Sequence, residues 1–154
     1  IDRPHEPALM VQEESFDRLI NTNLKAPLFL MRDFAKEMAR NEAGVIVNVS
    51  SVLARKSFIG SAIYRASKAG LEALTQQFAS ELGPKGIRVV AVAPGVIETA
   101  MTKDIPEEQR AGIKKDVALG GFGGPDAVAE TVWHAIENQY LTGAVIAVDG
   151  GMAL

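Results

Sequence analysis

A tyrosine and a lysine four residues apart, with a serine thirteen residues before the tyrosine, are the residues of this sequence best suited to chemistry. Tyr64 and Lys68 lie in a stretch with helical spacing of apolar residues, and side chains four apart share one face of a helix. A nearby cation favours the ionised form of a phenol, so Lys68 would help Tyr64 to donate and accept a proton. Ser51 follows an apolar run, and its hydroxyl could hold a carbonyl or alcohol oxygen against the tyrosine. The three residues predict proton transfer to and from a carbon-bound oxygen.

The same residues also have a simpler explanation. A Tyr-x-x-x-Lys pattern arises by chance in chains of this length, and it would then describe an amphipathic helix with Tyr64 packed and Lys68 solvated. Ser51 would be a turn serine at the end of a strand. The chemical interpretation therefore depends on what accompanies these residues.

Composition limits the classes of protein to consider. The chain has 154 residues, of which 47% are hydrophobic and 23% charged, and this suits one globular domain. A net charge of −3 gives no basic field for nucleic acid. We find no apolar run long enough to cross a bilayer and no signal peptide, so we expect no membrane partner. The absence of cysteine suits a cytoplasmic protein. His5 and His134 are isolated in the sequence, and we expect no metal site.

Apolar periodicity predicts helices that alternate with short strands. The expected helices span 13–40, 62–82 and 125–138, and the expected strands span 45–49, 87–93 and 144–148. Gly83-Pro84 is a strong helix stop, and Ser51 to Ser61 should be loop. This order predicts an α/β fold, with an open, doubly wound parallel sheet that is covered on both faces.

Three strands are few for such a sheet. A strand as apolar as 45–49 should pair on both edges, and the sequence lacks a glycine-rich phosphate loop that follows a strand and opens a helix. We therefore expect residues 1–154 to be the C-terminal part of a single, longer nucleotide-binding domain. The N-terminal cofactor-binding half would lie outside this chain.

Four motifs, in this order and spacing, resemble the short-chain dehydrogenase/reductase family. They are Asn-Thr-Asn-Leu at 21–24, Asn-Val-Ser-Ser at 48–51, Tyr-Arg-Ala-Ser-Lys-Ala-Gly at 64–70 and Pro-Gly-Val-Ile-Glu-Thr at 94–99. Within that family, residues 101–113 and 141–152 resemble the 3-oxoacyl-[acyl-carrier-protein] reductase group. The resemblance covers nearly the whole chain and implies a Rossmann-like fold.

The resemblance also implies roles for single residues. Tyr64 would be the general acid and base, and Lys68 would assist it and bind the nicotinamide ribose. Ser51 would orient the substrate oxygen, and Asn23 would hold a water molecule in a proton relay. Residues implied to hold the nicotinamide carboxamide come from one segment: Pro94, Gly95, Ile97 and Thr99.

Local chemistry supports the role of Asn23. Pro27 lies four residues after Asn23 and has no N–H, so the carbonyl of Asn23 loses its usual helical partner. A freed carbonyl is a good acceptor for a water molecule. The alternative is that Pro27 only marks a helix boundary. In the same way, Thr99 could be a helix N-cap, and Pro94-Gly95 could simply close a strand.

The implied activity is NAD(P)-dependent reduction of a carbonyl, or oxidation of the matching alcohol, with NADP preferred to NAD. The implied substrate is a 3-oxoacyl thioester, free or bound to an acyl carrier, and the implied assembly is a homotetramer through the helices at 13–40 and 62–82. A sugar, a steroid or another secondary alcohol is an alternative substrate. A truncated, non-catalytic fragment that acts as a binding or assembly module is the rival interpretation.

Residues 98–124 are polar, have few apolar anchors and many charges, and carry five glycines at 112, 120, 121, 123 and 124. Such a segment gains little from burial against its ordering entropy. It follows the end of a strand, so we predict a mobile lid over the substrate site. Related reductases usually have an arginine where this chain has Gly121.

Overall fold

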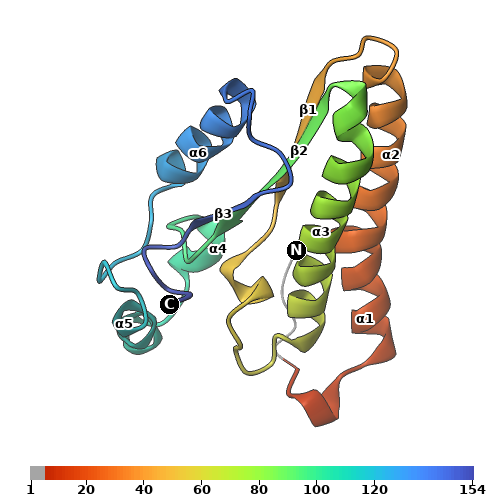
Figure 1. Ribbon diagram of the computed structural model, residues 1–154. Coiled ribbons are helices and arrows are strands. Elements are labelled where there is room, and N and C mark those ends of the chain that lie inside the picture. The colour runs from red at the N-terminus through yellow and green to blue at the C-terminus, as the bar shows by residue number, and fades with distance from the viewer. Residues whose placement is uncertain (1–5) are drawn as a thin grey trace.

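The computed structural model describes residues 6–154. It shows a three-stranded parallel sheet with helices on both faces (Figure 1). The strands are β1 (Gly44–Val49), β2 (Ile87–Pro94) and β3 (Val145–Val148), in the spatial order β1-β2-β3. Gly44 pairs with Ile87, and Ala91 pairs with Val145. The predicted α/β class and the three predicted strands are confirmed, with boundaries within one residue.

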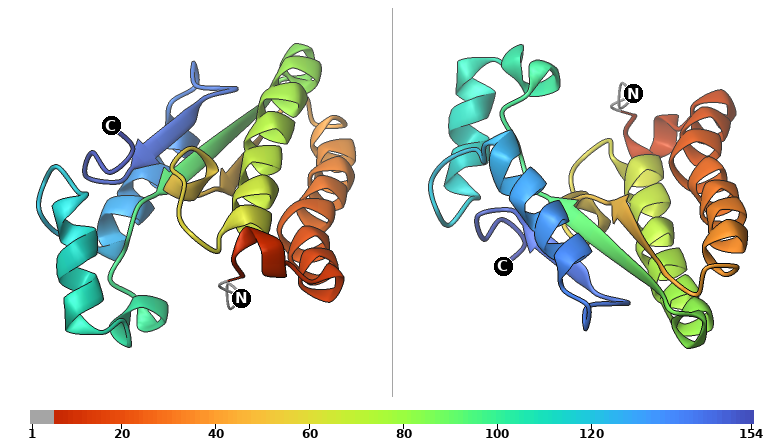
Figure 2. Two further views of the ribbon diagram at one scale, coloured as in Figure 1. Left: turned by 90° about the horizontal axis from the view of Figure 1, so that it is seen from below. Right: turned by 90° about the horizontal axis from the view of Figure 1, so that it is seen from above.

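Helices cover the two faces of the sheet as a doubly wound fold requires. One face is covered by α2 (Ala26–Met38) and α3 (Ala62–Leu82), and the other by α6 (Pro125–Glu137) (Figure 2). The remaining helices are α1 (Glu13–Ile20), α4 (Ala100–Lys103) and α5 (Glu107–Lys115). The loop predicted after β1 contains a short 3₁₀ turn, Val52–Ala54. None of the helices in the described part of the chain is long and apolar enough to span a membrane.

The single helix predicted over 13–40 is wrong in its middle. Between α1 and α2 the chain makes a π-helical turn, Asn21–Lys25, in which the N–H of Ala26 donates to the carbonyl of Asn21. Pro27 follows this turn at the start of α2. Proline has no N–H to donate to the carbonyl four residues before it. The wider π-helical turn, in which an N–H bonds to the carbonyl five residues before it, lets the helix continue past this missing bond.

The centre of the core is β2. Its residues Ile87, Val89, Val90, Ala91 and Val92 are fully buried. On one side, Val89 packs in a cluster with Met31 of α2 and with Leu71 and Ala79 of α3. A buried strand of this kind has a fixed position. It therefore also fixes where the segment after its carboxyl end, beginning at Gly95, leaves the sheet.

Buried polar side chains join β1 to α3. The Nδ2 of Asn48 donates to the Oγ1 of Thr75 at 2.9 Å, and that hydroxyl donates to the carbonyl of Leu71 at 2.8 Å. Buried polar groups that have partners cost little and favour one register of helix against strand. The contact is therefore one of the bonds that fix how α3 lies along β1.

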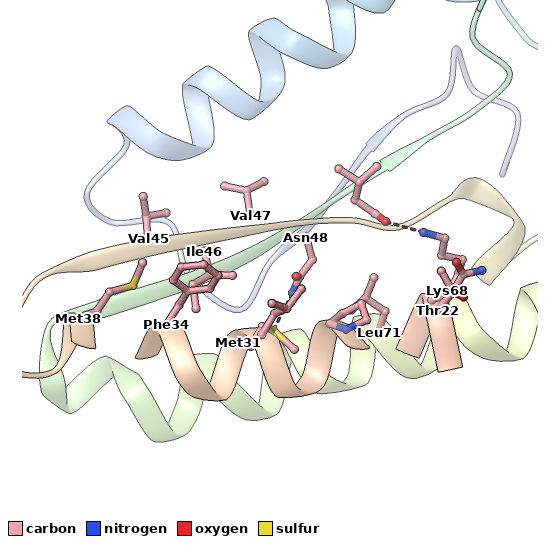
Figure 3. A pocket seen from close by; sticks show the side chains of 14 residues that line it. Thr22, Met31, Phe34, Met38, Val45, Ile46, Val47, Asn48, Lys68 and Leu71 are labelled. Atoms are coloured by element: carbon pink, nitrogen blue, oxygen red, sulfur yellow. Dashed lines mark hydrogen bonds between the residues drawn. The ribbon is translucent and has the colours of Figure 1, made fainter. Parts of the chain in front are cut away.

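One edge of β1 pairs with β2, and the other edge has no strand beside it among residues 6–154. That edge borders a groove of about 510 Å³ between β1 and α2 (Figure 3). The labelled side chains of Phe34, Met38 and Val45 line one end of it, and Lys68 lies at the other (Figure 3). An open strand edge beside apolar side chains is suited to pair with a further strand.

Arg88 of β2 closes the C-terminal end of α6. Its Nη1 donates to the carbonyl of Ala135 at 2.7 Å and to that of Leu141 at 3.2 Å, and its Nη2 donates to the carbonyl of Ile136 at 2.6 Å. The last carbonyls of a helix have no partner within the helix. Arg88 therefore holds α6 against its face of the sheet.

We predict that Arg88→Met lowers the free energy of unfolding of the full-length protein by about 1–3 kcal/mol, because it removes charged hydrogen bonds and leaves carbonyls unpaired. Urea denaturation measures this. Arg40→Met is the control, since Arg40 forms an ion pair with the exposed Glu37 on the surface of the molecule and should contribute less than about 1 kcal/mol. Equal losses in the two variants would contradict the capping role.

Candidate active site

A cavity of about 370 Å³ lies where β1 and β2 end, at the edge of the sheet where open parallel sheets bind ligands. Three of the predicted catalytic residues, Ser51, Tyr64 and Lys68, line it together. Apolar side chains that were not predicted from the sequence line the cavity as well: Val52, Leu53, Phe58, Val96, Ile105, Ile113 and Met152. Within residues 6–154, no three histidine, cysteine or acidic side chains are grouped so as to hold a metal ion, and His5 lies outside the described residues.

Ser51 is nearly buried and is the N-cap of the 3₁₀ turn Val52–Ala54. Its Oγ accepts a hydrogen bond from the N–H of Leu53 at 3.2 Å. The serine is therefore a turn serine, as the simpler explanation held, and it also lines the cavity. The bond to Leu53 uses an oxygen lone pair, so the hydroxyl hydrogen is able to donate to a substrate oxygen.

Tyr64 and Lys68 lie in the first two turns of α3, as their spacing predicts. The Lys68 ammonium is 5.8 Å from the centre of the Tyr64 ring, and it donates to the carbonyl of Val49 at 2.8 Å. Burial lowers the pKa of Lys68 from its usual value, because a desolvated ammonium is disfavoured. The bond to Val49 offsets part of that cost and holds the charge at the end of β1.

Asn23 does not line this cavity. It lines the groove beside β1, which Lys68 lines as well. The Nδ2 of Asn23 donates to the Oγ of Ser67 at 3.3 Å, and Ser67 donates to the carbonyl of Tyr64 at 2.7 Å. The structure thus joins the π-helical turn to α3 beside Lys68 through Ser67, a residue that sequence reasoning missed although it lies next to Lys68 in the chain. The water-holding role of Asn23 stays a prediction.

The segment after β2 forms the next part of the cavity. Pro94, Gly95, Ile97 and Thr99 all line it. The N–H of Gly95 donates to the carbonyl of Val148 at 3.0 Å, and a Cβ at Gly95 would lie 2.7 Å from the Cα of Asp149, so a side chain does not fit. Thr99 is the N-cap of α4, and its N–H donates to the Oγ1 of Thr102 at 2.9 Å. The turn and helix-cap interpretations are confirmed, and the carboxamide role stays a prediction.

The two ends of the segment 98–124 are bonded to each other. The N–H of Glu98 donates to the carbonyl of Gly123 at 2.9 Å, and the N–H of Gly123 donates to the carbonyl of Val96 at 3.0 Å. Between these ends lie α4 and α5. The segment is therefore a loop whose two ends are held together by hydrogen bonds next to the cavity.

Two contacts within this segment were not expected. Val117 is 4% exposed and packs against Val52, Leu53 and Met152, so it anchors the C-terminal part of a segment that was expected to have few apolar anchors. The guanidinium of Arg110 lies 4.4 Å from the centre of the Phe122 ring, next to Gly121. A Cβ at Gly121 would meet open space.

We predict that the N-terminal part of this segment closes over the bound substrate, while Val117 stays in place. Hydrogen exchange of the full-length protein, with and without cofactor and a substrate analogue, measures this. Amides of α5 should become more protected with ligands, because closure excludes water. The buried amides of β2 serve as the control. Equal protection of α5 in both states would show a fixed wall.

Comparison with known proteins agrees with this geometry. A family model described as enoyl-(acyl carrier protein) reductase matches residues 1–153. The chain is 41% identical over 149 residues to 3-oxoacyl-[acyl-carrier-protein] reductase of Rickettsia felis, a match that covers 96% of this chain and 62% of that protein. The chain belongs to the short-chain dehydrogenase/reductase family. It spans about three fifths of the length of the curated relative named here.

Solved structures share the fold closely. 4-Hydroxyisoleucine dehydrogenase complexed with NADH matches with a TM-score of 0.94 and 33% identity, over 98% of this chain and 64% of that one. A variant of ElxO with NADPH bound matches with a TM-score of 0.91 and 29% identity, over 99% of this chain and 63% of that one. Both similarities cover the whole arrangement of strands and helices described above.

Proposed function

We propose that the full-length protein is an NAD(P)-dependent oxidoreductase that reduces a carbonyl to an alcohol, or oxidises the matching alcohol. The observation that carries this proposal is the grouping of Ser51, Tyr64 and Lys68 around one cavity where two parallel strands end. The family of the chain and its similarity to a 3-oxoacyl reductase support the same activity.

Each residue has a distinct part in the proposed reaction. The hydroxyl of Ser51 donates to the substrate oxygen and holds it, and Tyr64 gives that oxygen its proton. The Lys68 ammonium, fixed by Val49, stabilises the phenolate that Tyr64 leaves behind. A nicotinamide cofactor, when bound, supplies the hydride that the carbonyl carbon receives. In the oxidative direction Tyr64 takes the proton back.

The residues present fit the nicotinamide end of such a cofactor. Lys68 offers ammonium donors to ribose hydroxyls, and the segment from Pro94 to Thr99 lines the same cavity. Similar solved structures hold NADH in one case and NADPH in another, and both cofactors suit this end of the site. We propose NADP in preference to NAD, following the resemblance to 3-oxoacyl reductases.

The cavity favours an apolar substrate. Among the described residues that line it, Lys68 alone is charged, and most of the others are apolar. A sugar or a hydroxy acid would leave hydroxyl or carboxylate groups without partners there. We propose a 3-oxoacyl thioester, free or on an acyl carrier, as the substrate. An apolar secondary alcohol such as a steroid is the second candidate, because the same side chains would contact it.

Tyr64→Phe tests the reaction. In the full-length protein we expect kcat to fall by about 10²–10⁴-fold, because the general acid is lost, with the fold and cofactor affinity retained. Steady-state kinetics with a 3-oxoacyl thioester and calorimetric titration of the cofactor measure both. Tyr140→Phe is the matched control, since Tyr140 is fully exposed. Turnover of Tyr64→Phe within a few-fold of wild type would exclude the proposed role. The rival, a non-catalytic module, predicts no turnover in any variant.

We also propose a homotetramer formed through the helices at 13–40 (α1 and α2) and 62–82 (α3). Phe16 of α1 and Phe29 of α2 are large apolar side chains that stay exposed at 46% and 43%, and a symmetric contact would bury them twice. Light scattering of the full-length protein at micromolar concentration should return a tetramer mass.

Phe29→Asp should lower that mass, whereas Leu119→Asp, which alters an exposed residue of the segment 98–124, should not. A monomer mass for the wild type would count against the assembly.

A further inference from the structure

Glu72 lies one turn beyond Lys68 on α3, and its carboxylate bonds to residues on both sides of the segment that contains Ser51. One oxygen, Oε1, accepts from the Oγ of Ser50 at 2.8 Å, and the other, Oε2, accepts from the Nε of Arg55 at 3.3 Å. Ser50 directly precedes Ser51, and Arg55 is the C-cap of the 3₁₀ turn that Ser51 begins. One side chain of α3 thus holds both ends of that turn.

Burial makes the bond to Ser50 the stronger of the two. The Glu72 side chain is only 12% exposed and Ser50 is buried, and a buried carboxylate needs donors to offset its lost hydration. The Oγ of Ser50 also lies 3.4 Å from the carbonyl of Lys68. The Arg55 side chain is 49% exposed, so solvent screens its ion pair.

We propose that Glu72 is a positioning residue, which holds Ser51 at the distance from Tyr64 and Lys68 that the reaction requires. This inference rests on the function proposed above. Glu72 is not among the described residues that line the cavity, so it acts through Ser50 and the turn and not on the substrate. Tyr64, Lys68 and Glu72 lie on one helix. That helix therefore carries the proton-transferring pair and also fixes the turn that carries Ser51.

A purely structural role for Glu72 predicts something different. It would make Glu72 equivalent to Thr75, which joins the same helix to the same strand through Asn48 at 2.9 Å but lies further from Ser51. Thr75→Val is therefore the matched control: it removes a buried bond between α3 and β1 and leaves the turn after β1 unaltered.

The experiment compares Glu72→Ala, Glu72→Gln and Thr75→Val in the full-length protein. It measures kcat and KM with acetoacetyl-coenzyme A as the 3-oxoacyl thioester, KM for the cofactor, and hydrogen exchange at residues 53–56. We expect Glu72→Ala to lower kcat by about 10–100-fold, because small displacements of reacting groups are costly, with KM for the cofactor little changed. The amides of Leu53 and Arg55 should exchange faster.

Glu72→Gln keeps an acceptor for Ser50 and should recover most of the rate. Thr75→Val should keep kcat within about threefold, since the geometry at Ser51 is intact.

Ser50→Ala keeps the test decisive if Glu72→Ala fails to fold, because it removes the stronger bond with a smaller change. Since Ser50 also lines the cavity, this variant is judged by faster exchange at Leu53 and Arg55 together with the loss in kcat. Equal kcat for Glu72→Ala and Thr75→Val, or unchanged exchange at Leu53 and Arg55, would overturn the positioning role while an active wild type left the proposed function standing. A wild type that reduces no carbonyl would overturn the proposed function itself.

Discussion

The hydrogen bond from the Lys68 ammonium to the Val49 carbonyl is the interaction on which the arrangement of the site depends. It joins α3 to the last residue of β1. It also offsets part of the cost of burying the ammonium, and this burial lowers the pKa of Lys68. The residues before and after Val49 bond to the same helix as well, Asn48 to Thr75 and Ser50 to Glu72. Lys68, Glu72 and Thr75 are spaced so that they share one helix face.

These three contacts between the end of β1 and α3 fix the relative positions of the residues that line the site. Side chains two apart on a strand point to the same face, so Asn48 and Ser50 both reach α3, while the carbonyl between them accepts the lysine. The helix cannot slide along the strand without breaking all of these bonds together. Tyr64 is carried on that helix, and its position relative to Ser51 follows from the register of helix and strand.

Sequence patterns predicted the elements well where one periodicity was enough. The spacing of Tyr64 and Lys68 placed both on one face of α3, and apolar runs located all three strands. They failed where the cause was not local. The π-helical turn depends on how the chain before Pro27 adjusts to the missing donor, and Val117 is an anchor because of residues far away in the sequence. The contact of Glu72 with Ser50 needed the helix–strand register, which no sequence pattern states.

The edge of β1 that has no strand beside it among residues 6–154 has a consequence for handling the protein. The strand, Gly-Val-Ile-Val-Asn-Val, contains no charged residue, no proline and no bulge, which are the features that proteins use to keep strand edges from pairing with other molecules. A short, uncharged, β-branched segment of this kind is prone to intermolecular pairing whenever it is uncovered. Solubility therefore depends on how early in folding this edge is covered, and any form of the protein that leaves it bare will tend to aggregate through β1.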